Sequence, residues 1–210
     1  MKKVIISLFL IIFIGVFCYS GYRIINWFLA NNQNKKINEE AKEYINHETN
    51  EVQFISLKEK NPDTVGWLTV NGTNIDYVVV KGKNNSFYLN HNFNKENNIS
   101  GWVFADYRNK FDGTDQNIII YGHNTMDGSM FGSLKNILKK EWYTNQDNLE
   151  VTLITDKELD TYRVFSIYQI EAEDYYVQMG DYIKNLADID LCNIHALKSM
   201  AKSVGCEYLT

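Results

Sequence analysis

The longest apolar stretch in the chain is uncharged, runs from Val4 to Tyr22, and follows Met1-Lys2-Lys3. A secretory signal has a shorter apolar region, about 7–15 residues, followed by a small-x-small cleavage site, and no convincing site of that kind is visible. The length instead suits a membrane helix of about 20 residues. We therefore expect residues 1–30 to form a signal-anchor helix with its N-terminus inside the cell; a cleaved signal peptide is the alternative.

Residues 31–60 change to a polar pattern. Residues 31–51 carry Lys, Glu, Asn and Gln, which is typical either of a solvated stalk or of a helix that continues from the span. Residues 51–61 fit a short amphipathic helix that ends before Pro62, because the residue before a proline disfavours the helical region. We expect a stalk and an N-terminal helix here.

From Asn61 onward the pattern predicts β-structure. Short runs rich in β-branched and aromatic residues alternate with turn residues, and Asn71-Gly72 is a strong hairpin signal. The predicted strands are 65–70, 75–80, 101–106, 116–121, 149–155 and 161–171. A helix or turn is expected at 87–93, and an amphipathic helix at 131–142. Many short strands with few helices predict a mostly β barrel or sandwich over residues 61–176.

The end of the chain has a different pattern. Apolar residues from Tyr182 to Met200 follow helical spacing, and only the last eight residues, Ser203–Thr210, suit an extended strand. We expect residues 177–210 to form a divergent, mainly helical tail.

Composition narrows the classes of function. The 210 residues are 45% hydrophobic and carry a formal charge of −5 that is spread along the chain. With no basic stripe, a nucleic-acid partner is not expected. The three cysteines are too few for a disulfide framework.

The candidate chemistry centres on His123. The run Asn117–Tyr121 leads straight into Gly122-His123-Asn124, so an imidazole is expected at the rim of a sheet, where sites are often built. Taken alone, a histidine in such a place is more often structural than catalytic. His47 lies in the polar segment and is expected to be a solvated bystander, His91 is expected to make structural hydrogen bonds, and His195 has no partner at a useful spacing. We expect no metal site and no cofactor.

A cysteine–histidine pair is the remaining enzymatic option, because a thiolate needs a nearby cation or base. Cys18 lies in the predicted membrane span and cannot serve. Cys192 lies in a predicted helix, where a buried, inert thiol is expected. Cys206 lies four residues from the end, in the weakly extended stretch.

Several blocks, in this order and spacing, resemble class B sortases, and the resemblance extends from about residue 51 to residue 176. The blocks are Asn61–Trp67, Asn74–Val79, Phe87–Phe93, Asp106–Asn109, Asn117–Asn124 and Asp127–Phe131. The resemblance implies a sortase-like β-barrel with flanking helices, preceded by a transmembrane helix and lacking its last two strands.

The resemblance also implies a function. Class B sortases are cysteine transpeptidases of Gram-positive bacteria that cut a sorting signal of the Asn-Pro-x-Thr-x kind after Thr. They attach the surface protein to an amine of the peptidoglycan or its lipid-linked precursor. His123 matches the family's catalytic histidine, which acts as general acid and base. The partners are then surface proteins with a C-terminal sorting signal, the cell wall and the cell membrane, with the catalytic domain outside the cell.

The chain departs from the family at the nucleophile. The family has a Thr-Leu-x-Thr-Cys strand followed by an arginine, whereas Thr152-Leu153-Ile154-Thr155 is followed here by Asp156, and the last arginine is Arg163. Three explanations are open. The chain is a truncated or frame-shifted product, or it is a degenerate, catalytically inactive surface module, or Cys206 serves as the nucleophile.

Overall fold

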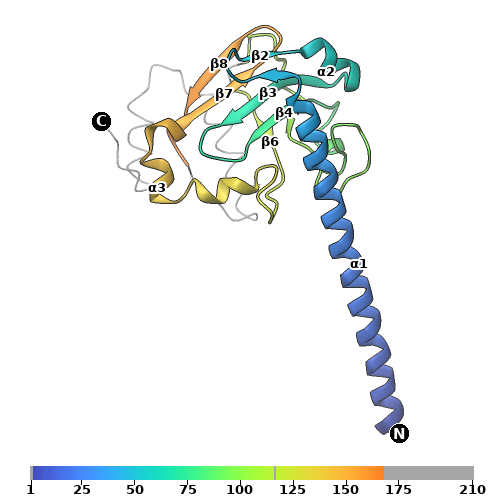
Figure 1. Cartoon of the computed structure of the whole chain (residues 1–210). Helices are drawn as coiled ribbons and strands as arrows, with labels where there is room; N and C mark the ends of the chain where they lie inside the picture. The colour runs from blue at the N-terminus through green and yellow to red at the C-terminus, as the bar shows by residue number, and fades with distance from the viewer. Residues whose placement is uncertain (1, 116, 168–210) are drawn as a thin grey trace. The chain divides into compact units, whose positions relative to one another are not determined.

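The computed structural model describes residues 2–115 and 117–167, which contain one main sheet, one small hairpin and several helices (Figure 1). The helices are α1 (Lys2–Lys42), α2 (Phe54–Lys60) and α3 (Lys140–Tyr143), with 3₁₀ turns η1 (Phe87–Leu89), η2 (Gly132–Asn136) and η3 (Gln146–Leu149). The strands are β1 (Ile45–Asn46), β2 (Glu51–Val52), β3 (Thr64–Val70), β4 (Asp76–Val80), β5 (Phe104–Ala105), β6 (Ile120–Tyr121), β7 (Glu150–Ile154) and β8 (Leu159–Arg163).

Helix α1 is one unbroken helix in which two sequence patterns follow each other (Figure 1). Its apolar side chains from Val4 to Leu29 are exposed, and the helix is long and apolar enough to cross a membrane. Beyond them, Asn31, Asn34, Ile37, Asn38 and Ala41 recur at helical spacing and are buried. Of the two alternatives for residues 31–42, the continuing helix is therefore the observed one, and a solvated stalk is not.

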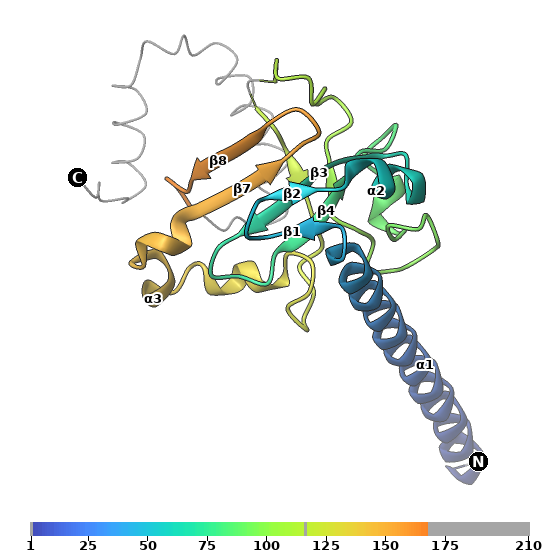
Figure 2. The ribbon, with the colours of Figure 1, turned by 45° about the horizontal axis from the view of Figure 1, so that its top comes forward.

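The main sheet has six strands in the described part of the chain, in the order β6-β5-β4-β3-β7-β8. Figure 2 labels four of them, β4, β3, β7 and β8. Strands β3 and β4 pair antiparallel around the Asn71-Gly72 turn, and Gly72 has φ +66°, a conformation that favours glycine. Strand β7 pairs antiparallel with β3 on its other side, and β8 returns beside β7. Strand β5 pairs parallel with β4 and antiparallel with β6, which is the outermost strand on that side among the described residues. The mostly β prediction is confirmed.

The core lies against β3 and β4. Trp67, Val78 and Trp102 are fully buried, and the Trp102 indole Nε1 donates to the Val78 carbonyl at 2.9 Å. Helix α2 covers this core with Phe54 and Leu57, which fits its predicted amphipathic pattern. It begins at Phe54, later than predicted, because Glu51 and Val52 pair with β1.

The predicted helix over residues 131–142 is wrong as a single element. It is divided into η2 and α3, which are joined by hydrogen bonds from Ile137 N to Leu134 O and from Lys139 N to Asn136 O. The reason is tertiary: Trp142 is buried and donates from Nε1 to the Gly72 carbonyl at 2.9 Å, which requires a turn before it.

Two strand predictions were too long, because the regular pairing is limited to Phe104–Ala105 and Ile120–Tyr121. Strand β8 covers Leu159–Arg163 and begins before the predicted 161–171, and residues 168–171 of that prediction lie outside the described residues. Trp102 and Val103 are fully buried in the core, and Val80 N donates to the Val103 carbonyl at 3.3 Å. The predicted helical tail over 177–210, with the boundary at residue 176, lies outside the described residues.

The first prediction concerns α2. Leu57→Ala leaves a cavity under a fully buried side chain and should lower the free energy of unfolding by about 2–5 kcal/mol. The control is Ile55→Ala on the same helix, where the side chain is 80% exposed and the change should stay within about 0.5 kcal/mol. Urea unfolding of the full chain in detergent, followed by tryptophan fluorescence, measures both. Equal losses in the two variants would contradict the packing of α2.

Candidate active site

His123 lies two residues beyond β6, which is the last strand on its side of the sheet in the described part of the chain. Strand β6 is held by β5, with Phe104 opposite Tyr121 and Ala105 opposite Ile120. The residue between strand and histidine is Gly122, and a Cβ there would lie 2.6 Å from the Phe131 ring. A side chain at this position would therefore displace Phe131. The sequence prediction that the imidazole lies at the rim of the sheet agrees with this geometry.

The imidazole of His123 contacts the end of η1. Its Nε2 is 2.7 Å from the Leu89 carbonyl oxygen. A carbonyl oxygen can only accept, so Nε2 carries the proton in this arrangement, and the lone pair of the neutral ring is on Nδ1. The hydrogen bond thus fixes both the orientation of the ring and the nitrogen that is available as a base.

The loop that follows holds the backbone of His123. The His123 carbonyl accepts hydrogen bonds from Thr125 N at 3.1 Å and Phe131 N at 3.0 Å. An isolated antiparallel bridge joins Asn124 to Met130, so residues 124–130 form a closed loop. We call residues 124–131 the histidine loop. It anchors the main chain of His123 independently of the contact at the ring.

A buried carboxylate supports the strand before His123. Asp106 is 1% exposed, and its Oδ2 accepts from Tyr121 OH at 2.9 Å and from Asn85 Nδ2 at 2.8 Å. Arg108 donates to both oxygens, from Nε at 2.8 Å and from Nη2 at 2.9 Å. The Arg108 hydrogen bonds hold the pKa of Asp106 far below its usual value, although burial opposes them.

Sequence analysis gave no role to Asp106, although it belongs to one of the blocks that carry the family resemblance. The signal available was the Asp106-x-Arg108 spacing, since an arginine two residues from an aspartate can fold back on it. The contact to Tyr121 is 15 residues away in sequence and could not be read from spacing. Asp106 therefore connects its own segment with Asn85 and with Tyr121, and Tyr121 belongs to β6, the strand before His123.

The other histidines have local contacts. His91 Nδ1 is 2.8 Å from the Phe87 carbonyl, and its ring stacks on Phe87 with centroids 4.0 Å apart. This geometry agrees with the structural hydrogen bonding expected for His91. His47 is half exposed, with Nε2 3.4 Å from Asp76 Oδ2, so it has an acidic neighbour that its sequence context did not reveal. His195 lies outside the described residues.

The sequence predicts that His123 works with a cysteine nucleophile, and the candidate Cys206 lies outside the described residues. Among the described residues the one cysteine is Cys18, which is exposed on the apolar part of α1. Cys192 and Cys206 lie outside the described range, so the pairing of His123 with Cys206 stays a prediction. Arg163 ends β8 and donates to the Gln146 side chain.

The Thr152–Thr155 motif lies in the hairpin between β7 and β8, where Asp156 has a local role. Thr155 N donates to the Glu158 carbonyl at 2.8 Å and closes the turn. The Asp156 carboxylate is 2.6 Å from Lys58 Nζ on α2. Asp156 is thus a turn residue that ties the hairpin to a helix, and its position in the fold does not correspond to a nucleophile beside His123.

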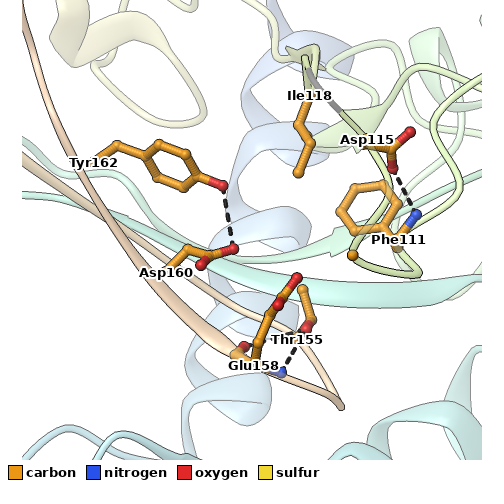
Figure 3. Close-up of a pocket in the computed structure, with 8 residues that line it drawn as sticks. Phe111, Asp115, Ile118, Thr155, Glu158, Asp160 and Tyr162 are labelled. Atoms are coloured by element: carbon orange, nitrogen blue, oxygen red, sulfur yellow. Dashed lines mark hydrogen bonds between the residues drawn. The ribbon is translucent and has the colours of Figure 1, made fainter.

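A cavity of about 250 Å³ lies between residues 111–118 and the β7–β8 hairpin (Figure 3). Its carboxylates have local partners: Asp115 Oδ2 accepts from Phe111 N at 2.8 Å, and Asp160 Oδ2 accepts from Tyr162 OH at 3.2 Å (Figure 3). In the described part of the chain no cluster of three or more His, Cys, Asp or Glu is arranged to hold a metal ion. We find no basis for a catalytic role of this cavity.

Comparisons with known proteins agree with this fold. A sortase-domain family model matches residues 68–191. Sortase B of Listeria monocytogenes is 36% identical over 178 residues, covering 80% of this chain and 71% of the relative. Sortase B of Staphylococcus aureus is 31% identical over 182 residues, covering 83% and 72%.

Solved structures show the same similarity. Sortase B of Clostridium perfringens has a TM-score of 0.56 at 41% identity, covering 60% of this chain and 67% of that one. Sortase B of Bacillus anthracis in complex with AAEK1 has a TM-score of 0.60 at 32% identity, covering 75% and 81%. The chain belongs to the sortase family of cysteine transpeptidases and, within that family, to class B.

The second prediction concerns Asp106. Asp106→Asn removes the charge that Arg108 and Tyr121 bind and should cost about 1–3 kcal/mol of unfolding free energy at pH 7. The pKa of Asp106 in the folded protein is depressed, so its contribution is complete above the unfolded pKa of about 3.9 and is lost as the pH falls below it. The stability difference from wild type should therefore narrow as the pH falls from 5 towards 2.

Urea unfolding at a series of pH values measures this difference. Asp112→Asn is the control, because the exposed Asp112 bonds locally to Thr114. A wild-type advantage over Asp106→Asn that stays constant from pH 7 to pH 2 would contradict the buried carboxylate.

Proposed function

We propose that this chain is a membrane-anchored sortase that cleaves a sorting signal of the Asn-Pro-x-Thr-x type after Thr and joins the surface protein to peptidoglycan. His123 is its general acid and base. The observation that carries the proposal is the contact between His123 Nε2 and the Leu89 carbonyl, just beyond the end of strand β6. That contact presents one defined ring nitrogen at the rim of the sheet, as proton transfer to a neighbouring group requires.

The reaction assigns His123 two successive proton transfers. A cysteine thiolate adds to the Thr carbonyl carbon, and the imidazolium gives its proton to the amine that leaves when the peptide bond breaks. The product is a thioester between Thr and the enzyme. An amine of the peptidoglycan precursor then attacks this thioester while the neutral imidazole takes the proton of that amine, and the thiolate leaves. Each half-reaction needs one protonation state of the same ring.

The nucleophile in this proposal is Cys206. Cys18 is on the apolar part of α1, where no sorting signal outside the membrane reaches it. Between the two remaining cysteines, Cys206 lies in the stretch with extended character, whereas Cys192 lies in a segment of helical periodicity. A thiol near an imidazolium is deprotonated more readily, which would activate Cys206 if it faces His123.

Helix α1 supports the membrane location. Its exposed apolar side chains from Val4 to Leu29 are unfavourable in water and favourable in hydrocarbon. Lys2 and Lys3 precede the span and favour an inside N-terminus, although Arg23, Lys35 and Lys36 reduce the charge difference. In this orientation the sheet lies outside the cell, where sorting signals and peptidoglycan precursors are available.

The contacts of Asp156 and Arg163 favour a second candidate function, a catalytically inactive module. Asp156 follows Thr152–Thr155 and is paired with Lys58, and Arg163 binds Gln146, so neither supplies the nucleophile or the oxyanion-stabilising arginine of the family. A catalytically inactive sortase-fold module that binds sorting signals or cell wall is the alternative function.

The third prediction tests these two functions. With the full chain in lipid nanodiscs and a fluorogenic peptide containing Asn-Pro-x-Thr, His123→Ala should lower kcat/KM by about 100- to 10,000-fold. Cys206→Ala should abolish thioester formation, detected by mass spectrometry of the intact chain. Cys192→Ala is the matched control and should retain wild-type turnover.

The outcomes separate the alternatives. Wild-type protein that binds the peptide but neither cleaves it nor forms an adduct with a thiol-reactive signal analogue supports the inactive module. Full activity in Cys206→Ala would refute Cys206 as nucleophile, and full activity in His123→Ala would refute the role of His123.

A further inference from the structure

Two segments hold His123, and helix α1 has a polar contact with the second of them and with Gly101, which packs against the first. One is the acceptor segment, residues 88–90, whose Leu89 carbonyl binds the ring. The other is the histidine loop, residues 124–131, whose amides bind the His123 carbonyl. The residues that make these contacts, Asn34 and Lys35, are consecutive on α1, so they diverge by about 100° around the helix.

The first contact reaches the acceptor segment through Gly101. The buried Asn34 side chain donates from Nδ2 to the Gly101 carbonyl at 2.9 Å. Gly101 has φ +54°, and a Cβ there would lie 2.4 Å from Tyr88 O and 2.7 Å from Leu89 O. The backbone of Gly101 therefore lies directly against the carbonyl that binds His123, and Trp102 N donates to Tyr88 O at 3.0 Å. A displacement of α1 at Asn34 is passed to the Leu89 carbonyl through packed backbone.

The second contact reaches the histidine loop through Asp127. Lys35 Nζ is 3.0 Å from Asp127 Oδ2, and Asp127 Oδ1 accepts from Ser129 N at 3.2 Å and Ser129 Oγ at 2.7 Å. Burial of Asp127 favours its neutral form, but the Ser129 hydrogen bonds and Lys35 outweigh it and hold the pKa well below its usual value. Asp127 is therefore ionised at neutral pH and attracts Lys35.

A cavity lies next to the ion pair between Lys35 and Asp127. Its volume is about 510 Å³, and Lys35 and Asn38 line it from α1 while Asp127 and Ser129 line it from the histidine loop. Open space thus separates α1 from the histidine loop at this point, and the Lys35–Asp127 ion pair joins the two beside that space. The Lys35 side chain is 52% exposed, so the pair contributes little to global stability and acts mainly on the loop.

We propose that Lys35 and Asn34 on helix α1 are positioning residues for His123, so that the helix carrying the membrane span is part of the scaffold of the active site. The proposal rests on the proposed function for the role of His123 in catalysis. The statement that Lys35 orders the histidine loop does not depend on whether His123 is catalytic. A flexible tether would not have this effect, because its polar residues would not contact either segment.

The fourth prediction uses Lys35→Met, which keeps the length of the side chain and removes its charge. Backbone amide exchange in residues 124–131 of the full chain in nanodiscs should rise about two- to fivefold. The His123 Nε2–H proton signal should broaden. Asp127→Asn should have the same effect, the double variant should add nothing further, and Lys35→Arg should restore slow exchange.

Lys36→Met is the matched control, because Lys36 is 81% exposed and its ion pair to Glu40, 4.0 Å away, stays within α1. If Lys35→Met leaves loop exchange and the ring signal at the values of Lys36→Met, the proposal is wrong. If the wild type is inactive or His123→Ala is fully active, the proposed function fails, while the exchange comparison still decides whether Lys35 positions the loop. In an active enzyme, Lys35→Met should lower kcat and leave KM unchanged.

Discussion

The hydrogen bond between the His123 ring and the Leu89 carbonyl joins two segments 34 residues apart, and the polar structure around the site depends on it. Its acceptor is fixed because Gly101 packs against residues 88 and 89 without a side chain between them. Its donor is fixed because the histidine loop binds the main chain of His123, and Asp106 holds Tyr121 two residues earlier. The ring thus has one orientation, set by backbone contacts from two directions. A histidine with one defined nitrogen available is suited to successive proton transfers.

Two carboxylates near this site, those of Asp106 and Asp127, are each bound by several donors. Asp106 is buried with Arg108, Tyr121 and Asn85 around it, so its negative charge is stabilised by several donors. Asp127 is stabilised by Ser129 and Lys35 in the same way. Both carboxylates stay ionised at neutral pH, and each acts on a segment adjoining His123. Because an uncompensated buried charge is costly, the buried Asp106 constrains its donors to one arrangement.

Membership in the sortase family is shown by the family model and by relatives above 30% identity. The family's cysteine motif is not reproduced at Thr152–Thr155, because Asp156 closes a hairpin and binds Lys58. Helix α1 is part of the folded domain as well as an apolar N-terminal helix, since its polar turns after Ala30 pack against the sheet domain. The apolar segment and the polar segment after it therefore form one continuous helix, α1.

The sequence by itself determined the features that depend on local pattern. The apolar span, the β3–β4 hairpin at Asn71-Gly72, helix α2 and the position of His123 after a strand follow from periodicity and turn chemistry within a few residues. Tertiary structure decided the rest. The burial of Trp142 against Gly72 divided the helix expected over 131–142, and Asp106, Asn34 and Lys35 acquired their roles from partners 15 or more residues away. Hydrogen bonds and ion pairs between such distant residues leave no periodic trace, because only the packed fold brings the two groups within bonding distance.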